Sequence, residues 1–187
     1  NYWRDNGHFA YLFNAALFNG RPLIKPEELE DLDTEASSIL EHRKHTESIS
    51  ASRDIIKARK RSSAHGVEFV LLGNESQEHI HYAMPMRIMG YDYNAYKKQY
   101  DSNSKKYKTS SGMSSDEYLS KMKKDDKFIP VITLTVYYGS KPWDGATSLH
   151  EMLNIPEGME PFVNNYRILL VEARKNKLTL HNVRNIN

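Results

Sequence analysis

The sequence predicts an α/β fold, with a mixed central β-sheet flanked by helices. Residues 53–60 carry the β-branched pair Ile55 and Ile56, residues 67–72 are almost wholly apolar, and the short polar stretch between them predicts an antiparallel hairpin. The second segment is apolar on both faces, which is typical of a central strand covered by helices on both sides. Residues 2–18 and 84–98 carry apolar side chains three and four positions apart and are the expected flanking helices.

The first expected helix has one continuous apolar stripe, formed by Phe9, Leu12, Phe13, Ala16 and Leu17. Asn6 is expected to cap its start, and the Asn19-Gly20 pair to end it in a left-handed conformation. Asn14 lies among the apolar residues, where a buried amide needs hydrogen-bond partners. The favoured interpretation of Asn14 is a structural link to a neighbouring loop.

The segment between this helix and the hairpin changes from apolar to acidic. Residues 21–25 are expected to be extended, and Pro26 followed by Glu27 and Glu28 is typical of a helix start. Residues 30–47 are charged almost throughout, and we expect them to be partly helical.

The hairpin brings acidic residues together. In an antiparallel pair the numbers of facing residues have a constant sum, and the midpoint of Asp54 and Glu75 falls within the expected turn at 61–66. The two residues should therefore face each other at the open end of the hairpin, with Cβ atoms roughly 5 Å apart. Gln77 points to the same face as Glu75, whereas Ser76 points away and leaves its carbonyl between them.

Two carboxylates this close repel each other, and a divalent cation resolves the conflict. Mg²⁺ takes oxygen ligands, usually one or two carboxylates with waters and a substrate phosphate. The alternative is that both carboxylates lie at a solvated strand end without a function, because acidic residues often end strands. The pattern alone leaves both interpretations open.

The spacing of three residues resembles the motif of the PD-(D/E)XK nuclease superfamily. These are Asp54 and, at the end of a buried strand, the Glu-x-Gln formed by Glu75 and Gln77, with Gln77 in the place that a lysine usually occupies. Three longer sequence blocks point to one family within this superfamily: residues 4–35, residues 73–92 (GNESQEHIHYAMPMRIMGYD) and residues 128–153. They look like the bacterial recombination-promoting nuclease family, which is related to transposases. The resemblance covers nearly the whole chain, with the blocks in the same order.

This resemblance implies a PD-(D/E)XK (restriction-endonuclease-like) core and a Mg²⁺-dependent DNA endonuclease, with Mn²⁺ as a substitute metal, linked to recombination or mobile elements. It implies that Asp54, Glu75 and the Ser76 carbonyl hold the metal and that Gln77 orients a water or binds the phosphate. Asp5 and Asn14 become weak candidates, because the first helix borders the active site in the superfamily. Tyr11 stands where the family pattern has an acidic residue, which is a departure from that pattern.

Basic residues near these positions are candidates for DNA contact. Arg87 lies one turn into the second helix, where its guanidinium would clamp a phosphate or instead form a structural ion pair with Asp92. Arg53 and Lys57 lie in a basic cluster on the first hairpin strand. His79 and His81 could share one face of a strand, but no third soft ligand is near in sequence, so a zinc site is not expected.

Composition limits the class of protein. The chain has 187 residues, enough for one domain, no cysteine, and a net charge of +2. No apolar run is long enough to span a membrane and no signal peptide is recognisable, so we expect a cytoplasmic protein without a membrane partner. Because the chain starts at Asn1 rather than Met, we expect a fragment, and the resemblance implies that a C-terminal region follows, since members of that family generally continue beyond this point. Such a fragment could require that region, or a homodimer, for activity.

The remaining expectations concern the second half of the chain. Residues 101–115 are expected to form a flexible insertion, residues 116–124 a short helix, and residues 128–138 and 167–172 strands. Ser148 and Glu151 form a capping-box pattern, and residues 176–187 are expected to be a frayed tail. The rival functional hypothesis is a catalytically weak or inactive DNA-binding domain that keeps the nuclease fold.

Overall fold

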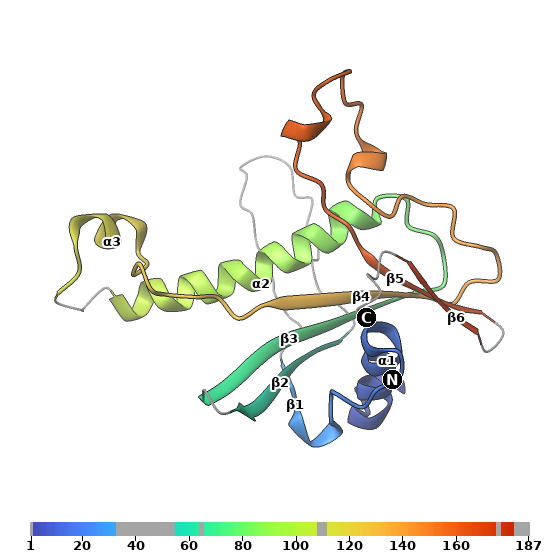
Figure 1. The fold of residues 1–187 in the computed structure, drawn as a ribbon, viewed down its shortest axis with the longest axis horizontal. Helices are drawn as coiled ribbons and strands as arrows, with labels where there is room; N and C mark the ends of the chain where they lie inside the picture. The colour runs from blue at the N-terminus through green and yellow to red at the C-terminus, as the bar shows by residue number, and fades with distance from the viewer. Residues whose placement is uncertain (1, 33–54, 64–65, 108–111, 175–176, 182–187) are drawn as a thin grey trace, which may run out of the picture.

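The computed structural model describes residues 2–32, 55–63, 66–107, 112–174 and 177–181. Two helices and a six-stranded sheet form its main body (Figure 1). The elements in chain order are η1 (Tyr2–Arg4), α1 (Asn6–Phe18), η2 (Pro26–Glu28), β1 (Leu29–Asp31), β2 (Ile55–Ser63), β3 (Gly66–Gln77), α2 (Met84–Tyr107), α3 (Ser115–Ser120), β4 (Val131–Tyr137), η3 (His150–Met152), η4 (Glu160–Phe162), β5 (Leu169–Arg174) and β6 (Lys177–His181).

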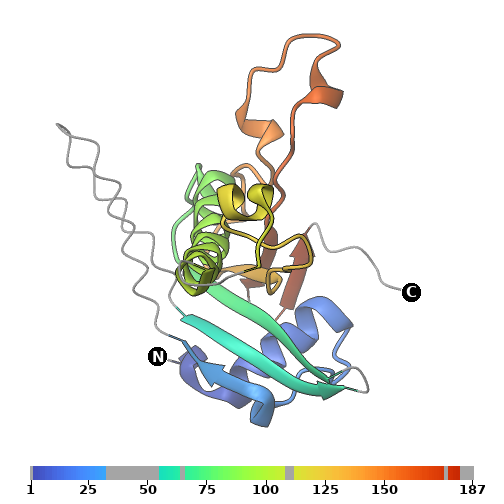
Figure 2. The same ribbon diagram turned by 90° about the vertical axis from the view of Figure 1, so that its left-hand side faces the viewer.

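The sheet is mixed, as the sequence predicts. Its strand order is β1-β2-β3-β4-β5-β6, with β3, β4 and β5 parallel to one another and the remaining neighbours antiparallel. The parallel connection from β3 to β4 passes through α2, as expected for a crossover that cannot be made by a tight turn. Figure 2 shows α1 on one side of the sheet and α2 on the other.

The predicted hairpin and its register are confirmed. β2 and β3 pair from Ile55 opposite Asn74 to Ser63 opposite Gly66, and each pair of residue numbers has the same sum as 54 and 75. The predicted turn at 61–66 was too long, because the strand ladder continues through the polar residues up to Ser63 and Gly66. β3 also extends to Gln77, since its last residues pair with β4.

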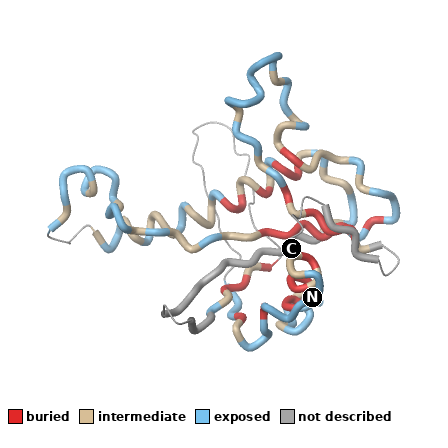
Figure 3. Tube along the Cα trace, viewed as in Figure 1, coloured by how far each residue is buried: buried red, intermediate tan, exposed pale blue. Residues whose placement is uncertain are grey.

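The larger core lies between α1 and the sheet. Leu134 and Val136 of β4 and Val171 of β5 contact the apolar stripe of α1 in a cluster of fully buried side chains (Figure 3). The predicted stripe is confirmed for the residues that contribute to this cluster: Phe9, Leu12, Phe13 and Ala16. Burial of these side chains is the main favourable term that holds α1 against the sheet.

The opposite face of the sheet packs on α2. Met84, Ile88 and Tyr91 of α2 form a second buried cluster with Tyr137, Ile168 and Leu170. Side chains alternate along β4, so that Leu134 and Val136 meet α1 whereas Tyr137 meets α2. Helices therefore cover both faces of the central strands, as predicted.

The ends of α1 differ in part from expectation. Its N-cap is Asp5 rather than Asn6, and the Asp5 carboxylate accepts a hydrogen bond from the His8 backbone N–H at 2.9 Å. The helix ends at Asn19 (φ 52°) and Gly20 (φ 80°), in the predicted left-handed conformation.

Several boundaries predicted from composition are wrong. The segment expected to be helical from residue 30 begins as strand β1, which pairs with β2, and residues 33–47 lie outside the described residues. The expected insertion at 101–115 is helical from Asp101 to Tyr107, because α2 continues past the sheet. The expected tail contains β6, which pairs with β5. Among the helices that the structure describes, none has the length and apolar character needed to cross a membrane.

Candidate functional site at the ends of β3 and β4

The candidate site lies where the parallel strands β3 and β4 end together. Glu75 is in register with Thr135, Ser76 with Val136, and Gln77 with Tyr137. The backbone N–H of Tyr138 donates to the Gln77 carbonyl at 3.0 Å and continues the pairing to the strand end. Carboxyl ends of parallel strands are the usual ligand-binding edge of open α/β sheets.

Thr135 is the buried hydroxyl in register with Glu75. Its side chain is fully buried, and its Oγ1 has no hydrogen-bond partner among the described parts of the chain. A buried hydroxyl without a partner is uncommon in native proteins and needs a specific explanation. Nothing in the sequence distinguishes Thr135 from the other β-branched residues of this strand, so the sequence analysis missed it.

A buried polar network lies two residues earlier on β4. Thr133 donates to the Asp92 carboxylate at 2.6 Å, and the Tyr166 hydroxyl donates to the other oxygen of the same group. Asp92 on α2 is thereby tied to β4 and to the segment that leads into β5. The network fixes the α2 side of the sheet next to the strand ends.

Arg87 lies in the first turn of α2, five residues before Asp92. Its Nε donates to the hydroxyl of Tyr91, one turn further along, and its guanidinium carbon lies 5.5 Å from the Tyr91 ring centre. The side chain is half-buried. Arg87 is therefore oriented by an aromatic neighbour, a geometry that favours a planar guanidinium over a lysine.

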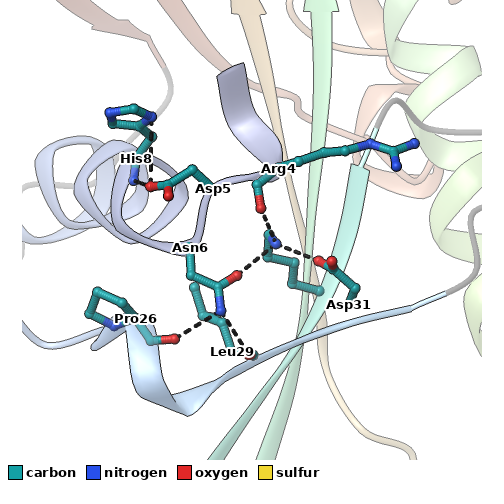
Figure 4. Close-up of polar contacts among 8 residues, drawn as sticks. Arg4, Asp5, Asn6, His8, Pro26, Leu29 and Asp31 are labelled. Atoms are coloured by element: carbon teal, nitrogen blue, oxygen red, sulfur yellow. Dashed lines mark hydrogen bonds and ion pairs between the residues drawn. The ribbon is translucent and has the colours of Figure 1, made fainter. Parts of the chain in front are cut away.

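The structure buries the side chain of Lys57 completely. Its ammonium group is fully buried and donates to the Arg4 carbonyl at 2.8 Å, to Asn6 Oδ1 at 2.7 Å and to Asp31 (Figure 4). It also lies 5.5 Å from the Phe9 ring centre. The structure does not support the predicted DNA contact of Lys57, because its buried ammonium group joins β2 to β1, to η1 and to the start of α1.

The two candidates on α1 have structural roles in the structure. The hydrogen bond from the His8 backbone, together with the nearby His8 and Lys57, holds the pKa of the Asp5 carboxyl below its usual range. The amide of Asn14 is buried and bonds both backbone groups of Ile24, accepting from N and donating to O at 2.8 Å each. This geometry confirms the predicted link from Asn14 to a neighbouring loop.

Other predicted site residues can be compared only in part. Asp54 and Arg53 lie outside the described residues, as do the side chains of Glu75 and Ser76. Gln77 is described and half-buried. The structure therefore brings the backbones of Glu75, Ser76 and Gln77 to the end of the parallel pair.

The donor atoms at this strand end are of the type that a hard divalent cation binds. A carboxylate at Glu75, a backbone carbonyl at Ser76 and the buried Thr135 hydroxyl are oxygen donors, which Mg²⁺ and Mn²⁺ accept. Among the described side chains, no three His, Asp or Glu residues lie close enough together to hold a metal ion. The buried Nδ1 of His81 also has no hydrogen-bond partner among the described residues. Donors for the predicted cation would thus come mainly from the hairpin.

The fold and the strand-end site together define a mixed α/β domain with a polar, partly buried sheet edge. Comparisons with protein-family models, curated proteins and solved structures find no match for this chain. The nuclease resemblance therefore stays a prediction.

Proposed function

We propose that the protein is a metal-dependent DNA endonuclease of PD-(D/E)XK type, acting in recombination or at mobile elements. The proposal starts from the residue motif of Asp54, Glu75 and Gln77. It is supported by a hairpin whose register matches the one that pairs position 54 with position 75. A mixed sheet with a helix on each face is compatible with such a core.

One observation supports the location of the reaction most directly. Glu75 is in register with Thr135 at the carboxyl end of a parallel strand pair, and Thr135 has a fully buried hydroxyl without a described partner. A polar group that has lost its water needs a compensating interaction. A cation, a water or a phosphate oxygen at this edge would provide one.

The proposed reaction is phosphodiester hydrolysis. A water oxygen bonds to phosphorus, one P–O ester bond breaks, and the leaving oxygen receives a proton. Asp54, Glu75 and the Ser76 carbonyl would hold the metal, which when bound supplies a nucleophilic water at neutral pH and offsets charge on the phosphate. Gln77 would orient the water or bind the phosphate.

Positive charge at the phosphate must come from another residue, because the neutral Gln77 amide cannot supply it. Arg87 is half-buried in the first turn of α2, the helix that follows β3 in the chain, and would bind the phosphate next to the cut, with Arg53 as a second candidate. Lys57 is not proposed for this role, since its ammonium is buried in contacts with Arg4, Asn6 and Asp31.

Nicking of supercoiled plasmid with Mg²⁺ or Mn²⁺ tests the proposal. Glu75→Ala and the isosteric Glu75→Gln should each lower the nicking rate at least about a hundredfold, because either change removes a metal-binding charge. Glu157→Ala, at an exposed carboxylate in the segment before β5, is the matched control and should nick at the wild-type rate. Circular dichroism establishes that each variant is folded.

Equal nicking by wild type and by both Glu75 variants would end the nuclease assignment. The rival class, a non-catalytic DNA-binding domain, makes a different prediction. Such a protein would bind DNA without nicking it, and calorimetry would show no Mn²⁺ binding that depends on Asp54, as tested with Asp54→Ala.

A further inference from the structure

The segment between β4 and β5 forms an arm that projects from the sheet, defined here as residues 143–166 (Figure 1). Hydrogen bonds cross its base, from Leu149 N to Tyr166 O at 2.8 Å and from Ile168 N to Thr147 O at 3.0 Å. Higher in the arm, His150 bonds the Val163 carbonyl at 2.7 Å and its backbone N–H bonds Asn165 Oδ1 at 3.0 Å. The arm is thus held in shape by polar bonds rather than by a core.

The outer part of this arm exposes large apolar side chains. Phe162 is 82% exposed, Met159 53% and Leu153 42%. Figure 3 shows most of the projecting part as exposed. An element held in a fixed shape, with an aromatic side chain at its outer part, pays little further entropy on docking, which favours an interface.

A pocket lies at another extremity of the molecule, between the end of α2 and α3. Its volume is about 310 Å³, enough for an aromatic side chain. Its lining is largely apolar or aromatic and comprises Ser104, Tyr107, Met113, Tyr118, Leu119 and Lys121. Tyr118 and Leu119 are 70% and 78% exposed, so this region too presents apolar surface to solvent.

The two regions carry opposite charge. The arm contains Asp144, Glu151, Glu157 and Glu160 without any lysine or arginine, a net charge of −4 with histidine neutral. Residues 97–127, which include the pocket, contain nine lysines and five acidic residues, a net charge of +4. Such complementarity speeds encounter and fixes orientation between partners.

The arm and the pocket lie apart in both views of the molecule (Figures 1 and 2), so the arm of one chain does not fill the pocket of the same chain. A complementary pair of surfaces on one molecule makes a heterologous contact between copies. We propose that Phe162 of one copy docks into the pocket beside α3 of a second copy. This self-association does not depend on the proposed nuclease activity.

Sedimentation velocity over a concentration series tests the contact. The wild-type protein should sediment as a dimer or larger assembly at micromolar concentration. Phe162→Ala removes the inserted ring and Leu119→Ser alters the pocket wall, and each should raise the dissociation constant at least about tenfold. Tyr11→Ala, at an aromatic side chain of α1 that is 70% exposed, is the control and should associate like wild type.

Mixing the two weakened variants gives the most specific result. Phe162→Ala keeps an intact pocket and Leu119→Ser keeps an intact arm, so an equimolar mixture should regain assembly that neither variant forms alone. A wild-type protein that stays monomeric, or assembly unaffected by either variant, would overturn the proposal. So would a mixture that fails to assemble, or variants that change only the affinity for DNA or for another protein.

Discussion

Two threonines of β4, two positions apart on the same side of the strand, differ in how their hydroxyls are satisfied. Thr133 donates to Asp92 at 2.6 Å, whereas Thr135 Oγ1 is buried without a described partner. A hydroxyl that donates to a buried carboxylate stabilises the fold, but an unpartnered one does not. Thr135 is therefore better explained by the proposed site than by stability.

Replacing each threonine by valine separates the two roles. Thr135→Val should leave the free energy of unfolding unchanged or raise it by up to about 1 kcal/mol, because no hydrogen bond is lost. If the proposed function holds, its nicking rate should fall about tenfold. Thr133→Val should lower the free energy of unfolding by about 1–3 kcal/mol, because Asp92 loses a donor. Urea denaturation measures the free energy of unfolding of both variants. Similar losses of stability in the two would show that the Thr135 hydroxyl is structural.

Lys57 is a residue whose role the sequence does not reveal. Its partners lie 26 to 53 positions away in the chain, at Asp31, Asn6 and Arg4. The Asp31 side chain is 72% exposed, so its charge is largely solvated even without the lysine. The main consequence of losing the ammonium would fall on the neutral acceptors at the start of α1.

Lys57→Met should lower the free energy of unfolding by about 2 kcal/mol, since two acceptors lose their donor. Lys60→Met, at an exposed position of the same strand, is the matched control and should change stability by less than about 0.5 kcal/mol. If the proposed function holds, Lys57→Met should bind DNA like wild type well below the unfolding transition. If Lys57→Met binds DNA more weakly than wild type and Lys60→Met does not, Lys57 contacts DNA after all.

Among the elements, α2 does more than cover the sheet. Beyond the sheet, the Gln99 amide bonds both backbone groups of Ile129, at 2.7 and 3.0 Å, and Tyr96 accepts from Val131 N at 3.2 Å. The Tyr107 hydroxyl, near the helix end, donates to Asp126. These contacts hold the returning chain along α2 until β4 begins, which explains why the polar residues 101–107 are helical.

The arm before β5 depends on one carboxylate at its base. Glu151 accepts from Thr147 N, Thr147 Oγ1 and Ser148 Oγ, each at 3.0 Å. The backbone bond from Thr147, followed by the bonds from Ser148 and Thr147, holds the pKa of Glu151 below its usual range. The capping box predicted at Ser148 and Glu151 is wrong, because the 3₁₀ turn η3 has Leu149 as its N-cap without a side-chain cap, and Ser148 instead donates its hydroxyl to Glu151.

Glu151→Gln should loosen the arm in a pH-dependent way. Because the pKa is lower in the folded protein than in the unfolded chain, the carboxylate stabilises the arm above the unfolded-state pKa. This contribution is lost as the pH falls through the folded-state pKa. Amide exchange at Thr147 should be less protected in the variant than in wild type at pH 7, by at most about 1 kcal/mol. The difference should shrink in acid, and a constant difference would exclude the charge as its cause.

For the whole molecule, alternation along strands made the central fold predictable. The register of β2 and β3 follows from apolar patterning and from the position of the turn, which are local properties of the sequence. The helices on both faces follow from the apolar stripes of α1 and α2 and from the two apolar faces of β3. The edge strands β1 and β6 were missed because they are only three and five residues long, and such short segments become strands through pairing with β2 and β5.

The polar contacts of the site were not predictable for a different reason. Asp92 bonds residues 41 and 74 positions away, and no local pattern marks such a pair. The lack of a described partner for the Thr135 hydroxyl is likewise visible only once the neighbouring strands and helices are packed together. Sequence reasoning therefore located the strand end, whereas three-dimensional structure identified the polar groups around it.

The central strand has a consequence for how the proposed site would respond to heating. Leu71 to Asn74 are paired on one side with β2 and on the other with β4, immediately before Glu75. Peptide groups engaged from two sides are the last to exchange with solvent, and fraying begins at edges and projecting segments. The backbone that carries Glu75 would stay ordered until cooperative melting of the sheet. If the proposed function holds, loss of nicking and global denaturation would therefore coincide.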